Sequence, residues 1–193
     1  MVIFNRFYLA YCRNKIMNLL RKTKTYLIGP MEYGDDNKNW RSVMDHNLEE
    51  MGVTCFNPYD HPFIENIDEG KQVQLQRLRE EGSLDNLQER MKTIRSYDLS
   101  MVDRSDFIIC YIKPNTPTWG TVDELVMAES LNRPVFICVE GGKRKAPLWV
   151  YSLCPHKYMY NSMNEIVQVL KGIDDGSIPT DSKRWRLLKN KYR

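Results

Sequence analysis

Apolar residues in this chain gather in short runs that alternate with longer stretches where they recur every three or four positions. Runs typical of buried strands, each closed by turn residues, occupy residues 25–28, 53–56, 107–112, 134–139 and 157–160. Helical spacing is found over residues 37–51, 71–81, 84–101, 119–131 and 164–170. This alternation predicts an α/β fold, namely one doubly wound domain of the Rossmann or flavodoxin type with about five parallel strands and helices on both faces.

The loops that follow the first three predicted strands are the expected place for a binding site. In a parallel sheet of this type, ligands bind beyond the carboxyl ends of the strands. Three segments should therefore converge there: residues 29–34, 57–60 and 113–120.

Asp98 interrupts an otherwise apolar helical stripe. The stripe consists of Leu87, Met91, Ile94 and Met101. Asp98 continues it by one helical step, so a carboxylate is expected on the buried side of the helix, where an unpaired charge is costly. Either Asp98 takes part in chemistry, or backbone amides or an arginine such as Arg95 or Arg104 hold it in place.

Glu124 is expected near the start of the next helix. Thr118 or Thr121 can cap that helix, and the positive end of the helix dipole favours an ionised carboxylate in its first turn. Glu124 shares an inward face with Ala128 and Leu131. The alternative reading is an ordinary first-turn glutamate without a chemical role.

Taken together, Asp98 and Glu124 suggest a reaction. Two carboxylates in one cleft are the usual equipment for breaking glycosidic bonds. Free amides around residues 119–121 could hold an anion such as a phosphate. The segment Gly29–Gly34 is neither G-x-G-x-x-G nor a Walker loop, which argues against a dinucleotide dehydrogenase or a P-loop NTPase.

Size and charge fit one domain with basic ends. The 193 residues are 42% hydrophobic and 27% charged, and no apolar run reaches the roughly 18 residues that cross a bilayer. The net charge of +3 comes mostly from the two ends, so we divide the chain into a basic extension at 1–24, a domain at 25–175 and a basic tail at 176–193. The ends could contact nucleic acid, but no DNA-binding motif accompanies them, and we expect neither a nucleic-acid nor a membrane partner.

The cysteine pattern predicts core thiols. The chain has five cysteines with no C-x-x-C pair, and Cys55, Cys110 and Cys138 lie inside strand-like runs. With only three scattered histidines, no metal site is expected. This pattern, with no signal peptide at the N-terminus, predicts a reducing, cytoplasmic location.

The same residues resemble the nucleoside 2-deoxyribosyltransferase family. Tyr26–Pro30 resembles its first strand and loop, and the spacing from Asp98 through Asp106 to Glu124 is similar to its own. The segment Gly120–Ala128 resembles its G-x-x-x-E-L-x-x-A catalytic helix. The similarity covers roughly residues 25–139 and is faint between residues 60 and 83.

The resemblance implies roles for these residues. Glu124 would attack the sugar C1′ and form a covalent glycosyl-enzyme, Asp98 would assist protonation of the leaving base, and Tyr26 would position Glu124. A second base or water would then accept the sugar, without a metal or cofactor. Asp106 would be structural. Residues expected to contact the substrate, a nucleoside or nucleotide, are Gly29, Pro30, Met31, Asn57, Thr118, Gly120 and Thr121.

Two departures from the family pattern leave the substrate open. Family transferases carry an acidic residue six positions before the nucleophile, whereas this chain has Thr118 there. The related deoxynucleoside 5′-monophosphate N-glycosidases have a small hydroxyl residue at that position. With Lys113 and the basic segment 143–145, Thr118 favours a phosphorylated substrate over a free nucleoside. In the transferases, a neighbouring subunit supplies an asparagine to the site, but this chain has Pro147 at the matching position. A homo-oligomer, dimeric or larger, is therefore expected from the family resemblance alone.

A second class of function also fits the pattern. A non-catalytic nucleotide-binding or sensor module of the same fold would use the same loops. It would need no nucleophile, so the presence of both Glu124 and Asp98 favours the enzyme.

Overall fold

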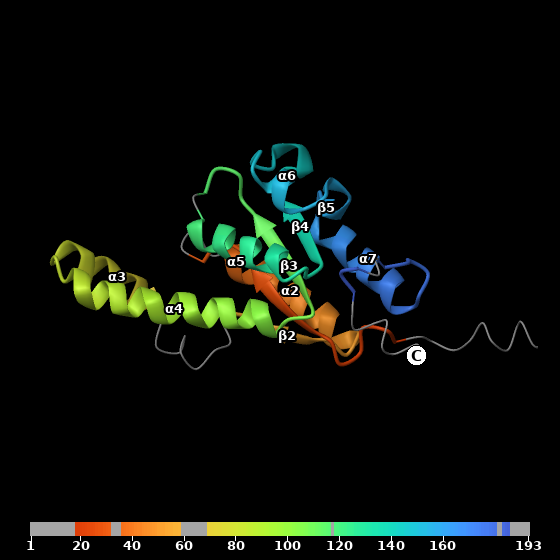
Figure 1. The fold of residues 1–193 in the computed structure, drawn as a ribbon, viewed down its shortest axis with the longest axis horizontal. Coiled ribbons are helices and arrows are strands. Elements are labelled where there is room, and N and C mark those ends of the chain that lie inside the picture. Colours follow the sequence, from red (N-terminus) through yellow and green to blue (C-terminus); the bar gives the residue numbers. More distant parts are fainter. Residues whose placement is uncertain (1–17, 32–35, 59–68, 117, 181–182, 186–193) are drawn as a thin grey trace, which may run out of the picture.

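Five parallel strands form one sheet in the order β2-β1-β3-β4-β5 (Figure 1). The computed structural model describes residues 18–31, 36–58, 69–116, 118–180 and 183–185. The strands are β1 (Lys24–Ile28), β2 (Thr54–Phe56), β3 (Phe107–Ile112), β4 (Val135–Val139) and β5 (Met159–Tyr160). The predicted α/β fold is therefore confirmed. The strand order is that of flavodoxin-like sheets, in which the order of strand addition, and not the strand direction, reverses between β1 and β3.

Helices cover both faces of the sheet. They are α2 (Asp36–Glu50), α3 (Glu69–Glu80), α4 (Leu84–Arg104), α5 (Trp119–Ser130), α6 (Val150–Leu153) and α7 (Met163–Asp174). One core cluster joins α2 and α7 to the sheet, and a second joins α4, α5 and α6 to the opposite face. Two short 3₁₀ turns, Lys143–Lys145 and His156–Tyr158, precede α6 and β5.

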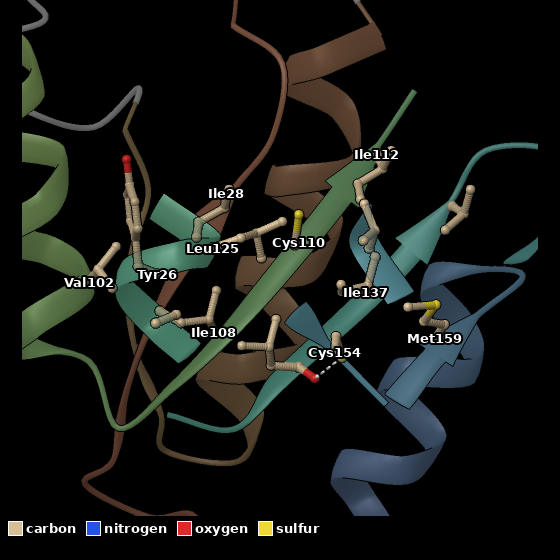
Figure 2. Packing of buried hydrophobic residues seen from close by; sticks show 14 of the residues in the cluster. Tyr26, Ile28, Val102, Ile108, Cys110, Ile112, Leu125, Ile137, Cys154 and Met159 are labelled. Atoms are coloured by element: carbon tan, nitrogen blue, oxygen red, sulfur yellow. Dashed lines mark hydrogen bonds between the residues drawn. The ribbon is translucent and has the colours of Figure 1, made fainter. Parts of the chain in front are cut away.

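The central strand β3 shows why the sheet needs both layers. Phe107 and Ile109 pack towards α2 and α7, whereas Ile108 and Cys110 pack towards α4 and α5. All four side chains are buried, as expected for a strand with a helical layer on each face. Figure 2 shows the second cluster, with Tyr26 at its rim and the tyrosine hydroxyl pointing away from the aliphatic side chains.

Side chains from outside the predicted domain limits complete the first core cluster. Leu20, which precedes β1, is fully buried, and Trp185, which follows every helix and strand, is only 4% exposed. The Trp185 ring lies 5.5 Å from that of Phe107 and 5.9 Å from that of Phe136. The division at residues 25 and 175 stays a prediction, but the core draws on side chains beyond both limits.

Helix α4 is less buried than its apolar stripe predicts. Met91 is 42% exposed, and Leu87 and Ile94 are half-buried; only near Met101 is the helix buried against the sheet. The reason is length, because the first half of α4 extends past the sheet beside α3 (Figure 1). Ser83 occupies the N-cap position of α4, yet its hydroxyl makes no capping hydrogen bond.

Several predictions concern residues outside the described part of the chain. These are most of the basic N-terminal extension, the segment 59–68 with Asp60, residues 32–35 of the first loop, and the tail beyond Trp185. Cys12 also lies there, whereas Cys110, Cys138 and Cys154 are buried free thiols, and Cys55 is a partly buried one. Among the described residues, no helix combines the length and apolarity needed to cross a membrane, and no three potential ligands are grouped to hold a metal ion.

Candidate active site

Three side chains that are far apart in sequence meet at the carboxyl ends of β1 and β3. The hydroxyl of Tyr26 lies 3.1 Å from Oε1 of Glu124 and 3.2 Å from Oδ1 of Asp98. Each separation is within hydrogen-bonding range. The structure therefore brings together Tyr26, Asp98 and Glu124, the three residues expected to be catalytic.

Each of these side chains comes from a different element. Tyr26 is in β1 and faces the layer formed by α4 and α5. Asp98 is on α4, one turn before the buried Met101, and Glu124 is on α5, one turn before the fully buried Ala128. The helical spacing of both acids with buried neighbours turns them towards the sheet, where the tyrosine meets them.

Burial dominates the electrostatics of the pair. Removal from water and, to a smaller extent, the negative charge of Asp98 together raise the pKa of Glu124 to about 8, against the opposing effect of the Tyr26 hydrogen bond. Burial also raises the pKa of Asp98 to about 6, again opposed by Tyr26. The pKa of Tyr26 is raised well above its usual value by burial and by the two carboxylates, so the phenol keeps its proton.

Neither Arg95 nor Arg104, the arginines that could have held Asp98 in place, pairs with it. Arg95 pairs with Asp123 instead, with its Nε 2.6 Å from Oδ2, and the Arg104 guanidinium lies over the Phe56 ring. Within the described residues, Tyr26 donates the hydrogen bond that Asp98 accepts. The expectation that Arg95 or Arg104 could hold Asp98 is therefore wrong.

Asp106 differs from the pair. Its Oδ2 accepts a hydrogen bond of 2.8 Å from the backbone amide of Lys24, which begins β1. That bond joins the amino ends of β1 and β3, away from Tyr26. This position is consistent with the structural role expected for Asp106.

The residues expected to contact substrate lie at the ends of three strands. Gly29 and Pro30 follow β1 and are packed against α2, and Met31 comes next. Asn57 follows β2 and is buried.

The remaining expected contacts lie where α5 begins. Thr118 takes the N-cap position, but its hydroxyl caps no amide of α5, so the side-chain cap predicted there is absent. Thr121 is buried inside the first turn of the helix. Gly120 is exposed, and a Cβ atom built on it would meet nothing within 4 Å. The start of α5 therefore presents an uncrowded backbone surface.

A cavity of about 430 Å³ lies at the carboxyl ends of β3 and β4. It is lined by Pro114, Asn115, Glu140, Gly141 and Lys145. None of the three expected catalytic residues lines it, so this cavity borders the loops of the site rather than the carboxyl pair itself.

Arg41 is a buried charge that we did not predict. Val43 is 61% exposed, whereas Arg41, two positions before it on α2, is fully buried. Arg41 lies three residues before Met44 and seven before Leu48, both of which are buried. This spacing, the same signal that marked Asp98, would have found it.

Comparison with known proteins agrees with this site. The family model for nucleoside 2-deoxyribosyltransferases matches residues 25–163. The chain belongs to this family. A comparison with curated proteins finds no match. The matched residues include all five strands of the sheet and the whole Tyr26–Asp98–Glu124 group.

Solved structures extend the comparison to the fold. The 2-deoxyribosyltransferase of the psychrotolerant bacterium Bacillus psychrosaccharolyticus is 18% identical, over 75% of this chain and 90% of that chain, with a TM-score of 0.53. The CMP N-glycosidase BcmB of Clostridium botulinum is 16% identical, over 76% of this chain and 97% of that chain, with a TM-score of 0.44. At such identity, the first of these likenesses shows a shared family fold.

Proposed function

We propose that this family member cleaves the N-glycosidic bond of a nucleoside or deoxynucleoside, or of its 5′-monophosphate, with Glu124 as the nucleophile. The observation that carries the proposal is the Tyr26 hydroxyl, which lies within 3.2 Å of both carboxyl groups. A buried and a half-buried carboxyl around one phenol are costly to the fold and suited to glycosidic chemistry. A module that only bound nucleotides would have no need of them.

A count of protons suggests how the group works. Tyr26 has one hydroxyl hydrogen and two carboxyl neighbours, so one carboxyl must carry a proton for both contacts to be hydrogen bonds. If Glu124 gives its proton to the Tyr26 oxygen while Tyr26 gives its own to Asp98, the phenol is regenerated. Glu124 is then ionised, and Asp98 is protonated.

That protonation state matches the proposed reaction. The Glu124 carboxylate forms a bond to C1′ as the bond from C1′ to the base nitrogen breaks, and the proton of Asp98 goes to the departing base. Water or a second base then attacks C1′, gives its proton to the Asp98 carboxylate and releases Glu124 as a carboxylate. Both steps invert the anomeric centre, so the configuration is retained overall.

We further propose that a 5′-monophosphate is the preferred substrate. A carboxylate at position 118 would repel a phosphate, whereas the Thr118 hydroxyl does not and is not used as a cap. Lys145 lines the cavity beside the loop that leads to α5. The first amides of α5 add donors without intrahelical partners.

An exposed apolar surface supports the further proposal of a homo-oligomer. On α5, Trp119, Val122 and Val126 lie on one side of the helix and are exposed, Trp119 to 85%. Just before α6, which contacts α5, Leu148 is 89% and Trp149 70% exposed. Apolar surface gathered in this way marks an interface, and self-association is its commonest use in soluble enzymes. Sedimentation should show a dimer or larger species that Val126→Glu dissociates.

We also propose that the protein works in the cytoplasm. Its described cysteines are free thiols, three of them buried, which suits a reducing compartment. Imaging of the tagged protein in its own cell would test this, and export to an oxidising compartment would contradict it.

A substrate screen tests the function. Purified protein is incubated with ribo- and deoxynucleosides and their 5′-monophosphates, with and without a free acceptor base, and released base is measured by chromatography. We expect release from a 5′-monophosphate that Glu124→Gln abolishes. Intact mass after reaction with a 2-fluoro sugar substrate should increase by one glycosyl group. Tight nucleotide binding without any base release would support the non-catalytic module instead.

A further inference from the structure

Arg41 shares with Glu124 the property of being a charged residue that is buried. They are the two such residues in the part of the chain that the structure describes. A guanidinium stays protonated inside a protein, so its burial is tolerated only when acceptors surround it. The acceptors of Arg41 therefore show what its position in the fold requires.

Those acceptors are backbone carbonyls where the chain leaves β1. Nη2 donates to the Gly29 carbonyl at 2.9 Å, Nη1 to that of Pro30 at 3.2 Å, and Nε to that of Leu27 at 3.4 Å. The planar fork of an arginine can hold several carbonyls in one fixed arrangement, which a lysine cannot do. Arg41 thus ties α2 to the loop that follows Tyr26 by three residues.

The same loop has little room to move. A Cβ atom on Gly29 would lie 3.0 Å from the Tyr111 carbonyl oxygen, 3.1 Å from the Trp40 ring and 3.4 Å from the Arg41 guanidinium. Trp40 also covers Arg41, whose Cζ lies 4.6 Å from the ring centroid. The loop is therefore held between α2 and β3.

The charge of Arg41 also acts on the carboxyl pair. It lowers the pKa of Glu124 and of Tyr26, against the effect of burial. Groups that influence the charge of Glu124 come from four elements: Tyr26 of β1, Arg41 of α2, Asp98 of α4 and Asp123 of α5. The charge of Glu124 in turn raises the pKa of the Cys110 thiol of β3. Arg41 is the one cation in this described set.

We propose that Arg41 is a positioning residue with two effects: it sets the path of the Gly29–Pro30 loop against the substrate, and its positive charge favours the ionised form of Glu124. The kinetic part of this inference rests on the proposed function. A lesser role, in which Arg41 only stabilises the fold, would alter neither substrate affinity nor the titration of Glu124.

Three variants separate the two effects. Arg41→Met removes the charge and the donors, Arg41→Lys keeps the charge but loses the fork, and Gly29→Ala displaces the loop while Arg41 stays. Arg104→Met is the matched control, because it removes an exposed arginine that lies over Phe56. The titration of Glu124 is followed by NMR of carboxyl-labelled protein, assigned with Glu124→Gln, alongside kcat and KM as functions of pH.

We expect Arg41→Met to raise the pKa of Glu124, because the one cation that lowers it is lost. Arg41→Lys and Gly29→Ala should leave that titration near the wild-type value and raise KM several-fold with a smaller change in kcat. Arg104→Met should change neither quantity.

Specific outcomes overturn the proposal. An unchanged Glu124 titration in folded Arg41→Met removes the electrostatic effect, and a wild-type KM in Arg41→Lys removes the effect on the loop. If Arg41→Met does not fold, Arg41→Gln replaces it in the titration, and Arg41→Lys still decides the loop. If the wild-type protein releases no base from any nucleotide, the proposed function fails, whereas the Glu124 titration still tests the electrostatic part.

Discussion

The carboxylates at the two edges of the sheet differ in their hydrogen-bond partners. At the amino edge, Asp106 accepts the backbone amide of Lys24, so its carboxylate takes the place of a sheet hydrogen bond between β1 and β3. At the carboxyl edge, the buried Glu124 and the half-buried Asp98 lie around one phenol and receive no backbone amide among the described residues. An acid that the backbone satisfies belongs to the fold, whereas acids left with a raised pKa are available for chemistry.

The strongest test of this difference in role is to replace one acid at each edge by its amide. Glu124→Gln should lower kcat by at least about 10⁴-fold, because no group remains to attack C1′. Its fold should persist, since an amide is less costly to bury than a carboxylate. Base release and thermal unfolding measure both effects.

Asp106→Asn is the matched control for that experiment. We expect kcat within a few-fold of wild type, with folding weakened by about 1–3 kcal/mol, because a charged acceptor of a backbone amide is lost. A Glu124→Gln enzyme that still releases base, or an Asp106→Asn enzyme that does not, would reverse the assignment of the two edges.

Loss of Asp98 should have the next largest effect. Asp98→Asn leaves the nucleophile in place but gives the departing base no proton, which should lower the rate by about 10²–10⁴-fold. The loss should be smaller for a substrate whose base leaves readily without protonation. Comparing kcat on a natural and an activated base measures this, and equal losses on both would argue against a proton-donating role.

The pH dependence of kcat/KM should report the shared proton. With pKa values of about 8 for Glu124 and about 6 for Asp98, the pair holds one proton between those limits. Activity should therefore fall about tenfold per pH unit below 6, where both are protonated, and above 8, where neither is. A profile without the limb above pH 8 would show that no proton of this pair is used. In Asp98→Asn, that limb should vanish, and the remaining one should have a midpoint below 8, because the charge of Asp98 raises the pKa of Glu124.

Stability should also depend on pH through Glu124. Its pKa rises from an ordinary 4.5 to about 8 on folding, so the folded protein binds the proton more tightly than the unfolded chain does. Stability is then greatest below pH 4.5 and declines as the pH rises to 8, by up to about 1.4 kcal/mol per unit. Chemical denaturation of wild type and Glu124→Gln across this window should show a difference that grows with pH, and a constant difference would contradict the burial of the carboxylate.

The smallest effect should come from an ion pair on the surface. Arg95 and Asp123 bind each other at 2.6 Å, but their side chains are 63% and 38% exposed. Water and salt screen such pairs, so Arg95→Gln should change the free energy of unfolding by less than about 1 kcal/mol. Thermal unfolding of this variant checks it, and a larger loss would mean that the pair supports α4 against α5.

Sequence spacing predicted the sheet and the carboxyl pair because both depend on local pattern. Runs of apolar residues define β1, β3 and β4, and helical spacing with buried neighbours locates Asp98 and Glu124. Their meeting at Tyr26 follows from the parallel topology, which brings the ends of neighbouring strands to one edge.

The features that were missed depend on contacts distant in sequence. Arg41 was not predicted to be buried, because the carbonyls that accept its hydrogen bonds are brought to it by the path of the loop after β1. The exposure of Met91 depends on how far the sheet extends beneath α4. The four-residue helix α6 is too short to show a period.

The burial of Trp185 has a consequence for biosynthesis. Its ring contacts Phe107 and Phe136, the residues at the centre of the face covered by α2 and α7, yet it follows every other element of the fold. Helices α2 and α7 can cover much of this face earlier, but Phe107 and Phe136 lack their contact with Trp185 until residue 185 has left the ribosome. Exposed apolar surface during synthesis attracts chaperones and neighbouring chains. Docking of Trp185 therefore shortens the time for which each new molecule is at risk of aggregation.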